Sequence, residues 1–264
     1  MYLLRKHLLS SLAILGLVAT PALAHSPYLK PNSFNPPETR KHVTVEAAFA
    51  EGDLRPDVAQ VSDAYHIIAP NGEVTKLSPA ATLKDALYLE APLDGAGTYL
   101  ISSGLRKGRI ANAALKDGEV RFLIPGTSVG EGETPIRVQS LTRADVYITS
   151  GKPTKPDFKT QGVELWPVSA PYDAYTGEAF TVQVREDGVP VGGQVVTVIQ
   201  DGQTYAVTKT AEYDLPTNDK GEVTFTPKEA GLYLLQVRVR RPSPEDASIW
   251  NSHTATLTLE VLPQ

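Results

Sequence analysis

Apolar and polar residues alternate over short stretches of this chain, and Gly, Pro, Asn or Asp interrupt the alternation at intervals of roughly ten residues. In AFTVQVRED, residues 179–187, apolar side chains recur at every second position. A period of two is typical of a strand that packs one face on a core. The turn residues between the stretches favour tight antiparallel connections. The pattern therefore predicts an all-β protein.

The predicted strands form two groups. The first comprises residues 42–49, 64–69, 98–103, 136–141 and 145–150, and the second comprises 179–187, 194–200, 222–227, 232–240 and 254–262. Only residues 105–118 have a composition that suits a helical turn or two. Residues 150–162 carry two prolines, three lysines and two glycines, as exposed connectors do. We therefore expect two antiparallel β-sandwich units, an N-terminal one over 25–150 and an immunoglobulin-like one over 162–264, with a linker at 151–161.

The two groups share a short internal similarity. PNGEVT (70–75) and GAGTYL (95–100) in the first group match DKGEVTFT (219–226) and EAGLYL (229–234) in the second. In β-sandwiches, a tyrosine at the start of a late strand often donates its hydroxyl to a neighbouring connection. Tyr99 and Tyr233 are candidates for this role, and the alternative is that both are ordinary strand residues.

The first residues have the three parts of a secretory signal peptide. Arg5 and Lys6 form a basic start, an apolar run extends from Leu8 to Val18, and Ala22-Leu23-Ala24 is an A-x-A cleavage site. The apolar run is too short for a permanent membrane helix, which needs about 20 residues. We therefore expect residues 1–24 to be removed after Ala24, which leaves an exported chain without stable membrane insertion and with His25 at its N-terminus.

Charge and cysteine content narrow the classes of function. Cleavage would shorten the chain from 264 to 240 residues, and the loss of two cations would change the formal charge from −5 to −7. A mildly acidic chain lacks the basic surface that nucleic acids require, so we expect no nucleic-acid partner. The chain has no cysteine. Disulfides and thiolate chemistry are therefore excluded.

Three segments carry a resemblance to a known family. They are residues 162–198, with a Leu-x-Pro segment, a Gly-Glu before a strand and DGVPVGG, residues 217–238, with TNDKG and AGLY, and residues 253–261. The chain resembles an exported bacterial family of uncharacterised function, commonly labelled as periplasmic components of nickel or cobalt uptake. The resemblance extends to the Ala-His mature start and to Pro31. It departs at Glu51-Gly52-Asp53, where family members often carry Gly-His.

This resemblance implies an immunoglobulin-like fold and a periplasmic location. It also implies a non-catalytic accessory protein that binds nickel or cobalt, with copper or zinc as alternatives, and passes the ion to a membrane or outer-membrane metal transporter. The sequence contains no catalytic signature such as Gly-x-Ser-x-Gly, His-Glu-x-x-His or a phosphate-binding loop. We therefore do not expect an enzyme.

His25 is the first candidate metal ligand because cleavage would place a free α-amine on the same residue. An amine and an imidazole together suit late first-row divalent ions. Pro27 has no amide hydrogen, so the chelate cannot continue through deprotonated backbone nitrogens to the third residue. The alternative is a frayed, solvated terminus. We expect His25 to bind the ion at two points with help from other side chains.

The other histidines are ranked by their surroundings in the sequence. His253 lies at the head of the last predicted strand and is the first choice for a second ligand, ahead of His66, which alternates with Ala64 and Ile68. His42 follows Arg40 and Lys41, whose charges disfavour a cation. The alternatives are a polar strand residue for His253 and a packed one for His66. Asp53 is a further candidate oxygen ligand.

A second class of function remains open. The chain could be an envelope binding or adhesion module that recognises a carbohydrate, a peptide or a partner protein, with its histidines incidental. Trp166, Tyr172 and Tyr175 lie close together in the sequence and would be its contact surface, since aromatic residues dominate recognition patches. The alternative for these aromatic residues is packing at the junction between the two units.

Overall fold

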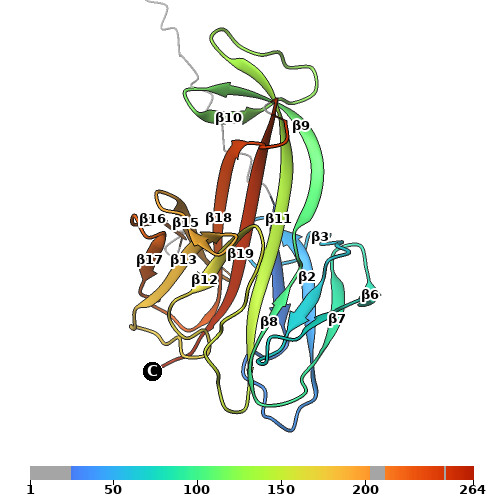
Figure 1. Cartoon of the computed structure of the whole chain (residues 1–264), viewed down its shortest axis with the longest axis vertical. Helices are drawn as coiled ribbons and strands as arrows, with labels where there is room; N and C mark the ends of the chain where they lie inside the picture. Colours follow the sequence, from blue (N-terminus) through green and yellow to red (C-terminus); the bar gives the residue numbers. More distant parts are fainter. Residues whose placement is uncertain (1–24, 203–211, 247) are drawn as a thin grey trace, which may run out of the picture.

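The computed structural model describes residues 25–202, 212–246 and 248–264, and none of these residues forms a helix. Their strands form three sheets (Figure 1). The predicted all-β fold with sandwich units is confirmed. The predicted signal peptide, 1–24, lies outside the described residues. Within the described part of the chain there is no helix with the length and apolarity that crossing a membrane requires.

The central sheet contains strands from both halves of the chain. Its main path, among the described residues, is β16 (Glu212–Pro216), β15 (Val195–Gln200), β18 (Gly231–Pro242), β19 (Ile249–Val261), β11 (Thr134–Ser150), β8 (Gly97–Ser102), β4 (His66–Ile68) and β5 (Val74–Lys76). β9 (Arg106–Lys116) pairs with β11 and with β10 (Glu119–Phe122). The sheet therefore runs through both predicted units.

β11 and β19 join the two halves. They pair in parallel, from Arg137 opposite Ile249 to Val146 opposite Thr258. The sequence predicts separate strands at 136–141 and 145–150, whereas β11 is one continuous strand. It is long because different neighbours pair with it along its length, β9 near its start and β8 near its end. This parallel pair differs from the antiparallel pairing expected throughout.

A second sheet covers one face of the central sheet (Figure 1). It consists of β1 (Ser26–Pro31), β2 (His42–Ala50), β7 (Leu87–Pro92) and β6 (Pro79–Thr82), with β3 (Val58–Ala59) paired to β2. Ala144, Val146 and Ile148 of β11 share a buried core with apolar residues of β2 and β7. The alternate positions of β11 thus form the floor of the N-terminal sandwich.

A third sheet covers the opposite face of the central sheet. It consists of β12 (Val163–Pro167), β13 (Phe180–Glu186), β14 (Val189–Pro190) and β17 (Glu222–Phe225). Its core contains Tyr147 of β11 together with Phe180, Leu235 and Leu257. Tyr147 and its neighbours Val146 and Ile148 therefore face different cores, as adjacent strand residues do. β11, β18 and β19 form the middle layer between the two outer sheets.

Residues 105–118, the one stretch that the sequence suggests for a helical turn, contain strand β9 instead. Ala113 and Ala114 favour a helix locally, but β9 lies between β10 and β11 and pairs with both. Tertiary pairing thus overrides the local preference. The expectation of helix in this stretch is wrong.

The predicted linker, 151–161, is exposed over much of its length but contacts the body at two points. Phe158 is buried and stacks on Tyr147, with ring centroids 6.3 Å apart. The Thr98 N–H donates to Thr154 Oγ1 at 2.9 Å. The division into 25–150 and 162–264 stays a prediction. The connector contacts both parts, because Phe158 lies in the core of the third sheet and Thr154 binds β8.

Both tyrosines of the internal similarity make the predicted contact. Tyr99 donates its hydroxyl to the Gly95 carbonyl at 2.9 Å, and Tyr233 donates to the Glu229 carbonyl at 2.8 Å. Each acceptor lies four residues before the tyrosine. The prediction of two equivalent tyrosine corners is confirmed.

Replacing Tyr99 or Tyr233 by phenylalanine should lower the free energy of unfolding by about 1 kcal/mol in each case, the net value of one hydrogen bond. Urea denaturation of the single variants measures the effect. Tyr213→Phe is the control, since the Tyr213 hydroxyl makes no hydrogen bond to any described residue and its removal should change stability by less than about 0.5 kcal/mol. A loss no larger than that of the control would contradict the role of the corners.

Candidate functional site

His25 lies at the head of β1, and the residues after it are fixed to the body. Ser26 is buried and its hydroxyl donates to Gln236 Oε1 of β18. Thr256 of β19 donates its hydroxyl to the Pro27 carbonyl at 2.7 Å. β1 also pairs along its whole length with β2. The main chain is therefore held in place directly after His25, which itself precedes the strand and is exposed.

The His25 ring is half-exposed and faces one carboxylate. Its Nε2 lies 3.6 Å from Asp57 Oδ2. Asp57 is itself held, because the Glu51 N–H donates to the same oxygen at 2.8 Å and the Asp57 N–H donates to the Phe49 carbonyl at 2.9 Å. Sequence reasoning missed Asp57. Nothing in the local sequence marks it, since its approach to His25 follows from the turn after β2.

This arrangement assigns different tasks to the two ring nitrogens. A metal chelated by the α-amine must use Nδ1, which closes a small ring, because Nε2 lies on the far side of the imidazole. A carboxylate that accepts a hydrogen bond from Nε2–H fixes the neutral tautomer whose lone pair is on Nδ1. Asp57 faces Nε2, although at 3.6 Å its oxygen lies slightly beyond hydrogen-bond distance. His25 Nδ1 is thus the ring nitrogen that does not face Asp57.

His253 is not at a sheet end but within β19, opposite Leu141 and Val239. It is buried, and its Nδ1 has no hydrogen-bond partner among the described residues. Burial lowers the pKa of His253; Glu186 and Asp187 oppose this shift, whereas Arg241 adds to it. The side chain contributes to the wall of a cavity of about 690 Å³ together with Glu186 and Asp187. Burial thus favours the neutral form of His253, and its Nδ1 is open to a further contact.

The remaining candidates have other contacts. His66 Nδ1 lies 2.9 Å from the Ala64 carbonyl, and His42 Nε2 lies 3.5 Å from Glu90 Oε2. Asp53 is buried and accepts hydrogen bonds from Arg55. Across the described residues, no group of three or more His, Asp or Glu side chains could hold a metal ion. The structure thus does not gather His25, His66 and His253 into one such group.

The aromatic residues of the alternative function are largely packed. Trp166 is buried in the core of the C-terminal sandwich, and the guanidinium carbon of Arg185 lies 4.4 Å from the centre of its ring. Tyr172 is half-buried, and Tyr175 forms an isolated bridge with Leu262. Packing, the alternative noted for these residues, accounts for Trp166.

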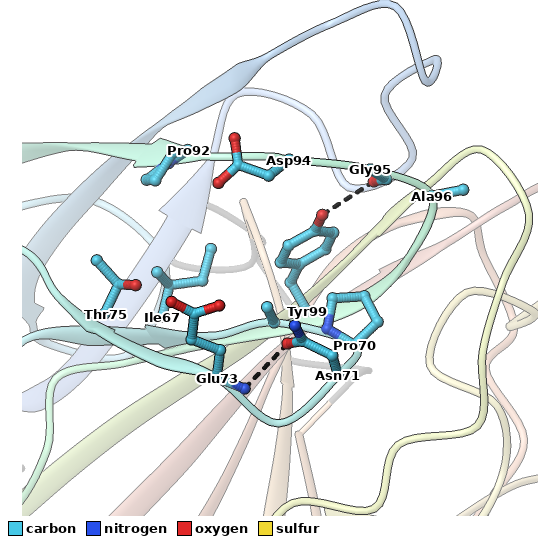
Figure 2. A pocket seen from close by; sticks show the side chains of 11 residues that line it. Ile67, Pro70, Asn71, Glu73, Thr75, Pro92, Asp94, Gly95, Ala96 and Tyr99 are labelled. Atoms are coloured by element: carbon cyan, nitrogen blue, oxygen red, sulfur yellow. Dashed lines mark hydrogen bonds between the residues drawn. The ribbon is translucent and has the colours of Figure 1, made fainter.

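A smaller cavity of about 230 Å³ lies at the end of the N-terminal sandwich, beside the Tyr99 corner (Figure 2). Glu73 and Asp94 come from the two loops that border it, and the Glu73 N–H donates to Asn71 Oδ1 at 3.0 Å. Figure 2 shows Glu73 beside Ile67 and Thr75, and Asp94 beside Pro92. Two carboxylates alone do not define a ligand site, so we assign none here.

The three layers of strands define an all-β sandwich protein with a candidate ligand site at the head of its first strand. A family model described as "Domain of unknown function (DUF4198)" matches residues 22–241, and the chain belongs to this family. The resemblance to a family of uncharacterised function is thereby confirmed, while a role in nickel or cobalt uptake stays a prediction. No curated protein matches the chain significantly.

Several solved structures align with the chain at low similarity. The D0-D1 domain of intimin is 13% identical, covers 87% of this chain and 96% of its own, and has a TM-score of 0.22. A DUF4785 family protein from Legionella pneumophila is 12% identical, with 80% and 50% covered and a TM-score of 0.24. The human OSCAR ligand-binding domain is 10% identical, with 89% of this chain and 98% of that chain covered and a TM-score of 0.21. At these scores the likenesses carry no argument about function.

Proposed function

We propose that the mature chain is an exported, periplasmic accessory protein that binds a late first-row divalent ion through His25 and passes it to a metal transporter without catalysis. Nickel or cobalt is the proposed cargo, following the family resemblance, and copper or zinc would fit the same donors. The single observation that carries the proposal is the 3.6 Å approach of Asp57 Oδ2 to His25 Nε2. It places a carboxylate beside the one histidine that signal cleavage would provide with an α-amine.

The donor set suits transfer rather than permanent storage. The amine and Nδ1 of His25 are two nitrogen donors, and Asp57 supports the ring from behind. Structural metal sites are usually closed by four protein ligands, whereas open positions leave room for water or for a ligand from a partner. An ion held at two points on an exposed edge can therefore be taken over by a transporter. His253 is buried within β19 and would join only as a separate site.

Metal titration by calorimetry tests this proposal on the mature protein, on His25→Ala and on a form with one extra residue before His25. The extra residue keeps the imidazole but displaces the amine. We expect both changes to abolish the high-affinity binding, and Asp57→Asn to weaken it by roughly tenfold or more, as loss of an outer partner does. Affinity should fall as the pH drops below neutrality, because both nitrogens must be unprotonated.

His42→Ala is the matched control, since His42 is exposed and also lies beside a single carboxylate, Glu90, at 3.5 Å. This variant should bind the ion as the unchanged protein does. Copper would bind most tightly in any such series whatever the natural cargo, so affinity order alone does not identify the ion. Equal binding by all forms, or no binding by any, would overturn the proposal.

A further inference from the structure

The face of the central sheet that carries β1 continues beyond the head of that strand. Thr256, whose hydroxyl reaches Pro27, marks the point where β1 begins. Residues in register on neighbouring strands direct their side chains to the same face. From Thr256 outward, this face presents two polar rows. The first consists of Arg106, Thr142, Thr254 and Arg238, and the second, two residues further along, consists of Ser140, Ser252 and Arg240.

Arg238 and Arg240 of β18 are half-buried, and neither forms an ion pair with a described residue. Glu119 of β10 is close enough for its charge to act on Arg240, but the two residues do not form an ion pair. Burial lowers the pKa of both arginines; the charge of Arg240 adds to this shift at Arg238, whereas the charge of Glu119 opposes it at Arg240.

Polar atoms without partners lie on the same face. Thr142 is buried, and its Oγ1 has no hydrogen-bond partner among the described residues; the same holds for Nε of Arg240. Arg238 Nε donates to Thr254 Oγ1 at 3.2 Å, which leaves its terminal nitrogens free for another acceptor. Buried donors are normally satisfied, by protein or by a bound species. Here the unsatisfied groups are all able to donate.

Arginine side chains lie at both borders of this face. Arg106 of β9 donates from Nε to the Val61 carbonyl at 2.8 Å, and its guanidinium lies 5.3 Å from the Phe49 ring centre. Arg240 lies 5.9 Å from the ring centre of Phe122 on β10, so the β9–β10 hairpin curves toward β18 (Figure 1). The hydroxyl rows thus lie between Arg106 on one border and two arginines on the other.

We propose that Arg106, Thr142, Arg238 and Arg240 form a binding site for a small oxyanion with at least two negative charges, either a phosphate or a polycarboxylate. Guanidinium groups match the geometry of both anions and donate several charge-assisted hydrogen bonds to them. A doubly charged anion would neutralise Arg238 and Arg240 together. The Thr142 hydroxyl would donate to it from the floor. The site requires neither His25 nor a metal.

Titration of the mature protein with inorganic phosphate and with citrate, at low ionic strength, tests the site. Trp250 lies on the same face, two residues from Ser252, so its fluorescence should change on binding. We expect Arg238→Gln and Arg240→Gln each to lower affinity by about tenfold, the value of one charged hydrogen bond. Stronger binding of citrate would identify a polycarboxylate, and stronger binding of phosphate a phosphate compound.

Thr142→Val separates ligand binding from folding. Valine has nearly the same shape, and it removes a buried hydroxyl that has no protein partner, so the melting temperature should not fall. Anion affinity should nevertheless drop by about threefold or more. Arg109→Gln is the control for general charge, since Arg109 is an exposed residue of the same strand as Arg106.

His25→Ala should leave anion binding unchanged, which separates this site from the proposed metal site. If the protein binds the anion but no metal, that result contradicts the proposed function and leaves the anion site standing. The inference is overturned if neither anion binds to the unchanged protein. It is also overturned if the Arg238→Gln/Arg240→Gln double variant binds as tightly as Arg109→Gln does.

Discussion

Replacing Arg143 by methionine is expected to lower the free energy of unfolding by about 3–5 kcal/mol at neutral pH, because it leaves buried carboxylates without their cation. Arg143 is buried, and its Nε donates to both oxygens of Asp145 at 3.0 and 2.8 Å. Its Nη2 lies 3.8 Å from Glu164 Oε2, and its Nη1 donates to the Gln161 carbonyl at 2.9 Å. One side chain thus ties β11 to the start of the C-terminal unit.

The loss should depend on pH in a defined direction. Burial raises the pKa of Glu164 above its ordinary value, and the charge of Arg143 opposes that rise. Without Arg143 the pKa of Glu164 should rise further, so the folded variant would bind a proton that the unfolded chain releases. Stability of the variant then increases as pH falls through that raised pKa. Urea denaturation at pH 8 and pH 5 should show a smaller deficit at pH 5.

Two further proteins make this prediction specific. The triple variant Arg143→Met/Asp145→Leu/Glu164→Met removes all three charges, and it should regain most of the lost stability, as uncharged replacements of buried ion clusters often do. Arg109→Met, at an exposed position, should change stability by less than about 0.5 kcal/mol. A loss for Arg143→Met as small as that of Arg109→Met would show that the cluster does not stabilise the junction.

Alternation along the chain predicts the strands well but not how they associate. AFTVQVRED and LYLLQVRVR become β13 and β18 because their alternate apolar residues have a core on one side. The parallel pairing of β11 with β19 joins residues more than a hundred positions apart, and no turn signal connects them. For the same reason β9 could not be identified: its alanines favour a helix until β10 and β11 are in place.

The sequence likewise predicts some residues of the candidate site and not others. His25 is predictable because a cleavage motif defines its chemistry locally. Asp57 is not, since its approach to His25 depends on the path of the chain after β2. The alternation in LYLLQVRVR places Arg238 and Arg240 on one face of a strand, yet it does not show that neither arginine forms an ion pair there. That property depends on which strands lie beside β18 and how far β1 reaches.

Gly221 is expected to tolerate no side chain, and Gly221→Ala should lower the free energy of unfolding by about 2–4 kcal/mol. The sequence predicts a turn at Asn218-Asp219-Lys220-Gly221, and φ of Gly221 is 72°, in the left-handed region. The turn also lies directly on β13 and the strand after it. A methyl group on Gly221 would lie 2.7 Å from the Val184 carbonyl oxygen and 2.9 Å from that of Val191.

These neighbours are backbone atoms that cannot rotate away. Val184 donates its N–H to the Gly221 carbonyl at 2.8 Å, and Val191 donates to the Val184 carbonyl at 2.9 Å, so relief of the clash would break pairing in the outer sheet. Gly188→Ala is the matched control, because φ there is 79° and no atom lies within 4 Å of the added methyl group. That variant should lower the free energy of unfolding only by the cost of a side chain at a positive φ, about 1 kcal/mol.

Chemical denaturation of the two glycine variants therefore separates the backbone conformation from the close approach. The loss in free energy of unfolding should be larger for Gly221→Ala than for Gly188→Ala by at least about 1 kcal/mol, the smallest usual cost of overpacking. Equal losses would mean that the turn can move off β13 without cost. In that case the contact between the turn and Val184 would not help to hold the C-terminal sandwich together.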